Sequence, residues 1–161
     1  MATEARDGIE TLTKFLDERG IAHETVEHEQ TYSATEEAKA AGVAPDHAAK
    51  TVLLRDGDAY RMAVIPASHR LDLPKARDAL GASAKLRLAT EEEMGADFTD
   101  FDVGALPPFG PLLPAPEVVD RRLLEHERIL CTGGDHRHSV LLDPNEVVRA
   151  ADATLADVCE D

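Results

Sequence analysis

Lys50 is the first residue of this chain whose type and position suggest chemistry. It follows Ala48-Ala49 and precedes the apolar run Thr51-Val52-Leu53-Leu54, so we expect it at the mouth of a strand. An ammonium group held in a cleft attracts a carbonyl or phosphate oxygen more strongly than in water, because the local dielectric constant is lower. The same position also suits a lysine that extends from a strand end into water. The residues alone leave both interpretations open.

A second candidate is the loop Gly104-Ala105-Leu106-Pro107-Pro108-Phe109-Gly110. Glycines that bracket prolines can hold backbone N–H groups in a rigid, exposed array, and such an array can bind a developing oxyanion or an ester oxygen. A tight turn between two elements is the alternative interpretation. Its leucine and phenylalanine favour a loop that packs against the protein.

A third candidate is the segment Thr132-Gly133-Gly134-Asp135-His136, which follows the apolar run Ile129-Leu130. Two glycines allow a backbone to approach a ligand closely. His136 could donate to a substrate hydroxyl or take part in proton transfer. The alternative is a glycine hairpin turn with an exposed histidine.

The same region contains a rival set of residues, His126, Cys131, His136 and His138. His136 and His138 would share one face of a strand, which allows a metal site by spacing. However, Cys131 has no CxxC partner and the chain has no HExxH pattern. We therefore expect no metal and no other cofactor. A Cys131–His nucleophile pair is equally poorly supported, since a cysteine inside an apolar strand is usually a small core residue.

Helix and strand signals alternate along the chain and must position these candidates. A helix is expected over 4–19, where apolar residues share one face and Gly20 follows. Capping residues indicate further helices from Ser33 to Gly42, from Asp72 to Gly81, after Thr90 and after Asp143. Short apolar runs bounded by turn residues indicate strands over 21–27, 49–55, 60–66, 84–88, 118–119, 128–132 and 139–142. This mixture predicts an α+β or mixed-sheet α/β domain.

Length and composition set further limits. The chain has 161 residues, which indicates a single domain over 1–161. It carries 32 acidic and 17 basic residues, so a broad nucleic-acid surface is disfavoured and we expect no DNA partner. An acidic chain poor in lysine is typical of proteins from salt-loving organisms. With no long apolar segment, no signal peptide and no disulfide framework, we expect a cytoplasmic protein without a membrane partner.

The order and spacing of these segments resemble the YbaK/prolyl-tRNA synthetase-associated domain family. The resemblance runs from about Phe15 to Val158 and is carried by the strand Lys50-Thr51-Val52-Leu53-Leu54, the helix start Leu71-Asp72-Leu73-Pro74-Lys75 and the G-x-x-x-P loop from Gly104 to Pro108. It implies a compact α+β domain with flanking helices around a mixed, partly barrel-like sheet. The family's essential lysine falls on Lys50, its loop on Gly104-Ala105-Leu106-Pro107, and its late glycine pair on Gly133-Gly134.

The resemblance also implies the function. We expect a trans-editing hydrolase that removes a small amino acid such as Ala, Ser or Cys from a mischarged tRNA, tRNA-Pro or a similar one. An aminoacyl ester is already activated, so positioning and charge stabilisation suffice for its hydrolysis. Lys50 would anchor the amino-acid carbonyl or the terminal phosphate, and the N–H groups of Gly104, Ala105 and Leu106 would hold the ester oxygen while water attacks. The alternatives are a non-catalytic module that docks on tRNA or a synthetase, and a metal-dependent hydrolase.

The remaining candidate residues concern specificity and tRNA contacts. Val26 and His28 end the first strand, and some members that clear cysteine have a tyrosine at the position of Val26. Leu106 and Phe109 would narrow the pocket and favour Ala or Ser, although pockets separate aliphatic side chains by only ~1–3 kcal/mol per methylene. The expected partners are the 3′ end of a mischarged tRNA and an aminoacyl-tRNA synthetase. Local cations for the tRNA end are Arg70, Lys75, Arg87 and Arg137.

Overall fold

A computed structural model describes residues 8–161, so residues 4–7 of the first expected helix lie outside the described part. The helices are α1 (Gly8–Glu18), α2 (Ala34–Ala41), α3 (Leu73–Leu80), α4 (Glu91–Asp97) and α5 (Pro144–Ala151). The strands are β1 (His23–Glu27), β2 (Ala49–Asp56), β3 (Ala59–Pro66), β4 (Arg87–Leu88), β5 (Glu117–Asp120), β6 (Ile129–Thr132), β7 (His138–Leu142) and β8 (Thr154–Ala156). The α+β class is therefore confirmed.

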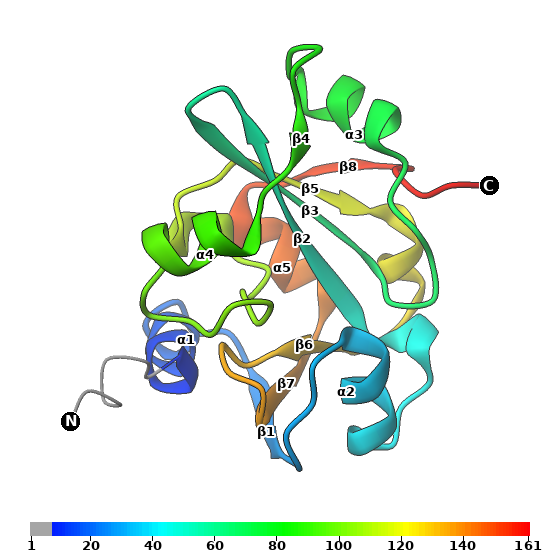
Figure 1. The fold of residues 1–161 in the computed structure, drawn as a ribbon. Helices are drawn as coiled ribbons and strands as arrows, with labels where there is room; N and C mark the ends of the chain where they lie inside the picture. Colours follow the sequence, from blue (N-terminus) through cyan, green and yellow to red (C-terminus); the bar gives the residue numbers. More distant parts are fainter. Residues whose placement is uncertain (1–7) are drawn as a thin grey trace.

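The strands form two sheets (Figure 1). One has the order β1-β7-β6 and is antiparallel; the other has the order β4-β2-β3-β5-β8 and is mixed, because β5 runs parallel to both β3 and β8. A single parallel bridge between Ala48 and Leu130 connects them just before β2 begins. Within residues 8–161, the strands do not close into a barrel. In Figure 1, α1 and α2 lie on either side of the three-stranded sheet.

The helix caps form as the sequence predicts. The Ser33 hydroxyl accepts from the Glu36 N–H, and Gly42 ends α2 in the left-handed conformation with φ of 77°. Asp72 caps α3 in the same way, and Thr90 with Glu93 makes a reciprocal capping box on α4. In the first box the Glu36 carboxylate accepts from the Tyr32 N–H instead of from Ser33. These caps satisfy N–H groups that the helix itself leaves unpaired.

One strand prediction needs correction, and one strand was not predicted. Of the expected strand 84–88, only Arg87–Leu88 pairs with β2, because the Ser83 hydroxyl accepts from the Lys85 N–H and makes a turn before it. The three-residue strand β8 was not expected. It pairs in parallel with β5, and so short a segment carries no readable periodicity.

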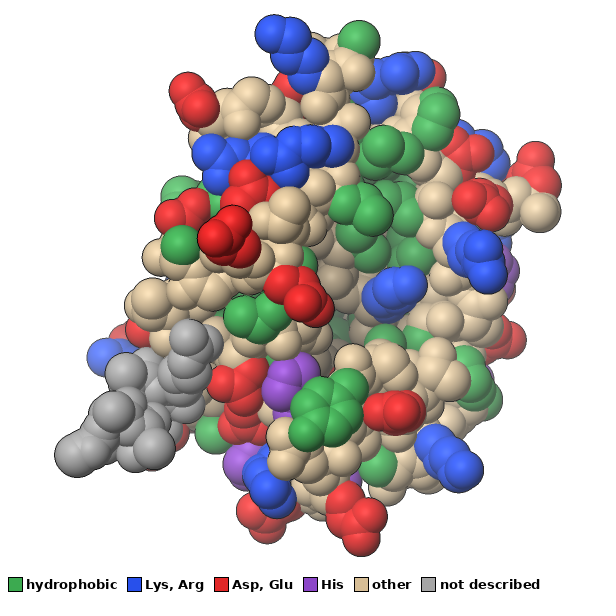
Figure 2. All heavy atoms as spheres, viewed as in Figure 1, with side chains coloured by type: hydrophobic (Ala, Val, Ile, Leu, Met, Phe, Trp, Pro, Cys, Tyr) green, Lys and Arg blue, Asp and Glu red, His purple; other side chains and the backbone are tan. Residues whose placement is uncertain are grey.

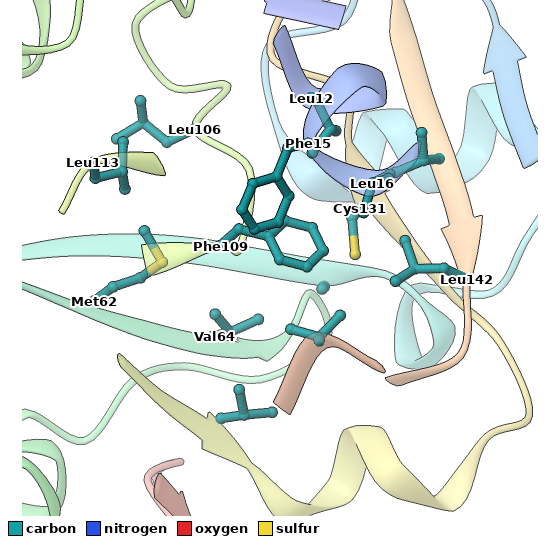
Figure 3. Close-up of a cluster of buried hydrophobic side chains, with 14 of the residues drawn as sticks. Leu12, Phe15, Leu16, Met62, Val64, Leu106, Phe109, Leu113, Cys131 and Leu142 are labelled. Carbon is teal, nitrogen blue, oxygen red and sulfur yellow. The ribbon is translucent and has the colours of Figure 1, made fainter. Parts of the chain in front are cut away.

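The main hydrophobic core lies between the two sheets and α1. Leu12, Phe15 and Leu16 of α1 enter it, and the ring of Phe15 lies 5.2 Å from that of Phe109 (Figure 3). Phe109 itself is fully buried, so the proline-rich loop is anchored from beneath. Within residues 8–161, no helix has the length and apolar content needed to cross a membrane.

Candidate active site

A cavity of about 250 Å³ opens beside the bridge that joins the two sheets. The three segments singled out in the sequence all contribute to its wall, through Ala49, Lys50 and Thr51, through Gly104 and Leu106, and through Thr132, Asp135 and His136. Figure 2 shows a hollow on this face, with charged, histidine and hydrophobic side chains around it. The fold thus brings together segments that are far apart in the sequence.

Lys50 supplies a cation that makes no ion pair with a carboxylate of residues 8–161. It is the second residue of β2, it is exposed, and it lines the cavity. Among residues 8–161, no carboxylate oxygen lies within 4.0 Å of its ammonium nitrogen. Lys75, by contrast, lies 3.3 Å from both Asp157 and Asp161. The ammonium group of Lys50 is therefore available to an electron-rich atom of a ligand.

Gly104 gives the loop its shape at the cavity. Its φ of 85° lies in the left-handed region, whereas a Cβ there would meet only the His136 ring at 3.7 Å. Conformation, not space, therefore requires glycine at this position. The Ala105 N–H donates to the Asp102 carbonyl at 2.9 Å. This contradicts the expectation that Ala105 helps to hold an ester oxygen, and it leaves the amides of Gly104 and Leu106 as the candidates.

The rest of the loop packs into the protein and supports the cavity from outside its wall. Pro107, Pro108, Phe109 and Gly110 are buried and do not line the cavity, so Phe109 does not narrow it as expected, while Leu106 does. The Gly110 N–H donates to Glu117 Oε1 at 2.8 Å, and Glu117 Oε2 is buried without a partner in residues 8–161. Burial raises the pKa of Glu117 to about 8. A neutral carboxyl therefore supports the loop at neutral pH.

The β6–β7 turn places Asp135 and His136. His136 Nε2 lies 2.9 Å from the Val103 carbonyl and must donate to it, which ties the turn to the loop. Gly133 and Gly134 do not line the cavity. A Cβ on Gly133 would lie 2.7 Å from the His138 carbonyl oxygen, and one on Gly134 would lie 2.7 Å from Gly8. The two glycines allow close packing of the hairpin, and not the close approach to a ligand that we expected.

The segment before and within α2 was missed as part of the site. Thr31, Tyr32, Ser33, Ala34 and Glu37 all line the cavity. Tyr32 is 70% exposed, and its ring lies 5.4 Å from that of His136. The capping box predicted this helix, but a local pattern does not reveal which distant segment the helix end will face.

Glu37 is the buried carboxyl of the cavity wall. Only 6% of the residue is exposed, and its Oε2 accepts from the Ser139 hydroxyl. Burial raises the pKa of Glu37 to about 7, the Ser139 hydrogen bond opposes the rise, and the charge of Asp135 adds to it. His28 does not line the cavity but reaches it indirectly, because its Nε2 lies 2.8 Å from the same Ser139 hydroxyl. Val26 does not line it either.

The expected tRNA cations do not gather at the cavity. Lys75 pairs with carboxylates near the C-terminus, and Arg87 makes two hydrogen bonds to Glu93. Neither of them, nor Arg70, lines the cavity. Arg137 is next to His136 and exposed, and its guanidinium donates to Gln30 at 3.2 Å. Of the four, only Arg137 is adjacent to a lining residue.

The rival residue set does not assemble. Cys131 is fully buried, and burial raises the pKa of its thiol far above the usual range, so it is a poor nucleophile. His126 stacks on His47 at 3.9 Å, while His138 Nδ1 donates to Asp135 at 2.9 Å. In the described part of the chain, no three His, Cys, Asp or Glu side chains are grouped so that they could hold a metal ion.

Comparisons with known proteins show the family and the fold of the chain. The model of the aminoacyl-tRNA editing domain matches residues 28–150. A structure described as a candidate trans-editing enzyme for prolyl-tRNA synthetase is 29% identical over 96% of this chain and 98% of its own, with a TM-score of 0.84. The hypothetical protein APE2540 is 29% identical over 92% and 99%, with a TM-score of 0.82. A candidate signal transduction protein from Marinobacter aquaeolei VT8 shares the fold at 22% identity and a TM-score of 0.69, over 93% of this chain and 30% of its own.

Proposed function

Because the chain belongs to the aminoacyl-tRNA editing domain family, we propose that it is a deacylase that hydrolyses the ester of mischarged aminoacyl-tRNA. The observation that carries this proposal is the unneutralised Lys50 ammonium in a cavity that also contains the Gly104 turn. An ester carbonyl placed there would meet a cation and the amides of Gly104 and Leu106. Such preorganised donors stabilise the oxyanion that develops when water attacks.

The proposed substrate carries a small amino acid, such as Ala, Ser or Cys, on tRNA-Pro or a similar tRNA. The cavity of about 250 Å³ is smaller than the ~300–1,000 Å³ of pockets that take drug-sized ligands. Leu106 on its wall would limit the acyl side chain. Thr31, Thr51 and Thr132 also line the cavity, and their hydroxyl groups would suit a polar side chain such as that of Ser.

Tyr32 is the proposed platform for the terminal base. It projects into solvent at the cavity, and a base can stack on an exposed aromatic ring without sequence preference. Arg137, which follows the cavity residue His136 in the chain, is the expected cation proposed to contact this end of the tRNA. With so few local cations, we expect modest affinity for tRNA alone, a shallow dependence of binding on salt, and help from a synthetase.

A panel of mischarged tRNAs tests the proposal. The protein is incubated with tRNA-Pro charged with Ala, Ser, Cys, Val or Leu, at low and at high salt, and the remaining ester is measured over time. We expect hydrolysis of at least one small aminoacyl ester and little of Val or Leu. EDTA should leave the rate unchanged. If the protein binds these tRNAs but hydrolyses none, it is a docking module instead.

A further inference from the structure

Glu37 presents one carboxylate oxygen to the cavity. Its Oε2 is held by Ser139, whereas its Oε1 has no hydrogen-bond partner in residues 8–161. In that part of the chain, the one side-chain polar atom that is both closed off and unpartnered is Glu117 Oε2, so Glu37 Oε1 remains accessible. Since Glu37 lines the cavity, that access is from the cavity side. A donor on a bound ligand can therefore reach this oxygen.

The second oxygen of Glu37 belongs to a chain of hydrogen bonds. Ser139 lies between Glu37 Oε2 and His28 Nε2, and His28 Nδ1 lies 2.7 Å from the Glu29 carbonyl, to which it must donate. Two proton arrangements satisfy this chain. A neutral Glu37 can donate to Ser139, which donates to His28. Alternatively, protonated His28 donates to Ser139, which donates to the Glu37 carboxylate.

The other charged groups on the cavity wall already have hydrogen-bond partners or a proposed role. Asp135 accepts from His138 Nδ1 and from the Arg137 N–H at 2.8 Å. Lys50 repels a cation and attracts the ester carbonyl. Both oxygens of Asp135 have partners, whereas Glu37 Oε1 has none in residues 8–161, so Glu37 is the better partner for a cationic part of the ligand. An aminoacyl ester has one such part, its α-ammonium group.

We propose that Glu37 binds the α-ammonium group of the aminoacyl ester, an inference that rests on the proposed function of the same cavity. When the ammonium group binds, the Glu37 proton moves to Ser139 while the Ser139 proton moves to His28. Glu37 becomes a carboxylate and His28 an imidazolium, and no proton is gained or lost. The site therefore selects a free aminoacyl ester over an α-hydroxyacyl or N-acylated one, because these lack the cation.

The surroundings of Glu37 fit this role. The groups that face it are Ser139 of β7, His28 just after β1, Asp135 from the β6–β7 turn, and the Cys131 thiol, while Lys50 lines the same cavity. Burial raises the pKa of Glu37 to about 7, so the carboxyl can hold or release its proton near neutral pH. A bound cation would favour the ionised form.

The proposal can be tested apart from catalysis by measuring the binding of two analogues in which an amide replaces the ester. The probes are 3′-alanylamino-3′-deoxyadenosine and 3′-lactylamino-3′-deoxyadenosine, which differ only by an ammonium or a hydroxyl group on the α-carbon. The wild type should bind the alanyl probe about 10- to 100-fold more tightly, as a charge-assisted hydrogen bond allows. Glu37→Gln should bring this ratio close to one. Glu36→Gln, the exposed neighbour on the same helix, should keep it.

A preference retained in Glu37→Gln overturns the proposal. Should that variant not fold, ¹⁵N chemical shifts of His28 in the wild type decide: the alanyl probe should shift them to imidazolium values and the lactyl probe should not, and unchanged shifts overturn it too. The proposed function fails separately. A protein that prefers the alanyl probe but hydrolyses no aminoacyl-tRNA would contradict the deacylase and leave the Glu37 inference standing.

Discussion

The cavity wall and the underside of the Gly104–Gly110 loop each contain a buried glutamate, and the two differ in what the carboxyl group can reach. Glu37 has one oxygen on Ser139 and the other open to the cavity. Glu117 has one oxygen on the Gly110 N–H and the other enclosed without a partner. Burial raises the pKa of both, to about 7 and about 8.

This difference distinguishes a carboxyl group proposed to bind a ligand, that of Glu37, from one that only supports the fold, that of Glu117. A titratable group with a perturbed pKa is a candidate functional residue only when something can reach it, since structural burial perturbs a pKa as well. A ligand can reach Glu37 from the cavity, whereas Glu117 is enclosed. The same contrast separates Leu106, on the cavity wall, from Phe109, which is fully buried three residues later.

The largest expected effect on stability is at Phe109. Phe109→Ala removes a fully buried ring that packs on Phe15, and such truncations cost about 3–5 kcal/mol. Chemical denaturation should show this loss, whereas Leu88→Ala, at a residue that is 57% exposed, should change the free energy of unfolding by less than ~0.5 kcal/mol. If Phe109→Ala lowers the free energy of unfolding by less than about 1 kcal/mol, Phe109 does not anchor the loop to the core as described.

Glu117→Gln should change how stability depends on pH. The folded state of the wild type keeps the Glu117 proton up to about pH 8, while the unfolded chain releases it near the ordinary value of 4.5. The folded state therefore binds more protons in this window, and Glu117 makes stability fall by about 1.4 kcal/mol per pH unit as pH rises through it.

Glutamine cannot ionise, so the variant should become more stable relative to the wild type between pH 5 and pH 8. Denaturation midpoints at several pH values measure this difference, and deacylation at pH 7 should stay near the wild-type rate. Parallel stability curves for the two proteins would show that Glu117 is not buried as described.

The smallest expected effect is at Tyr32, and it should appear in binding alone. Tyr32→Ala removes a stacking surface worth about 1–3 kcal/mol per base, so KM for an aminoacyl-tRNA should rise roughly 5- to 100-fold. The free energy of unfolding should hardly change, because the side chain is 70% exposed. Tyr32→Phe keeps the ring and should behave like the wild type. An unchanged KM in Tyr32→Ala would remove the stacking proposal.

Local chemistry predicted most of the elements. Ser33, Asp72 and Thr90 cap helices as expected, since a cap depends on residues three positions apart. The three segments of the cavity were also identified, though by family resemblance more than by their residues. Glu37 and Tyr32 were not, because their roles depend on the Ala48–Leu130 junction and on contacts over a hundred residues away, such as that of Glu37 with Ser139.

Two roles changed for reasons that no sequence pattern displays. Ala105 uses its N–H inside a turn to Asp102, and Gly133-Gly134 relieve close contacts with His138 and Gly8. A glycine needed for packing and a glycine needed for a ligand look the same in a sequence. Gly104 has a positive φ and lines the cavity, and its role toward an ester stays a proposal.

The central claim is that the Lys50 ammonium stabilises charge that develops on an ester in this cavity. The most direct measurement is the single-turnover deacylation rate of Lys50→Ala on the best substrate of the tRNA panel, with Lys39→Ala, an exposed lysine of α2 outside this cavity, as control. We expect a loss of roughly 10²- to 10³-fold for Lys50→Ala and a wild-type rate for Lys39→Ala. A wild-type rate in Lys50→Ala would contradict the account.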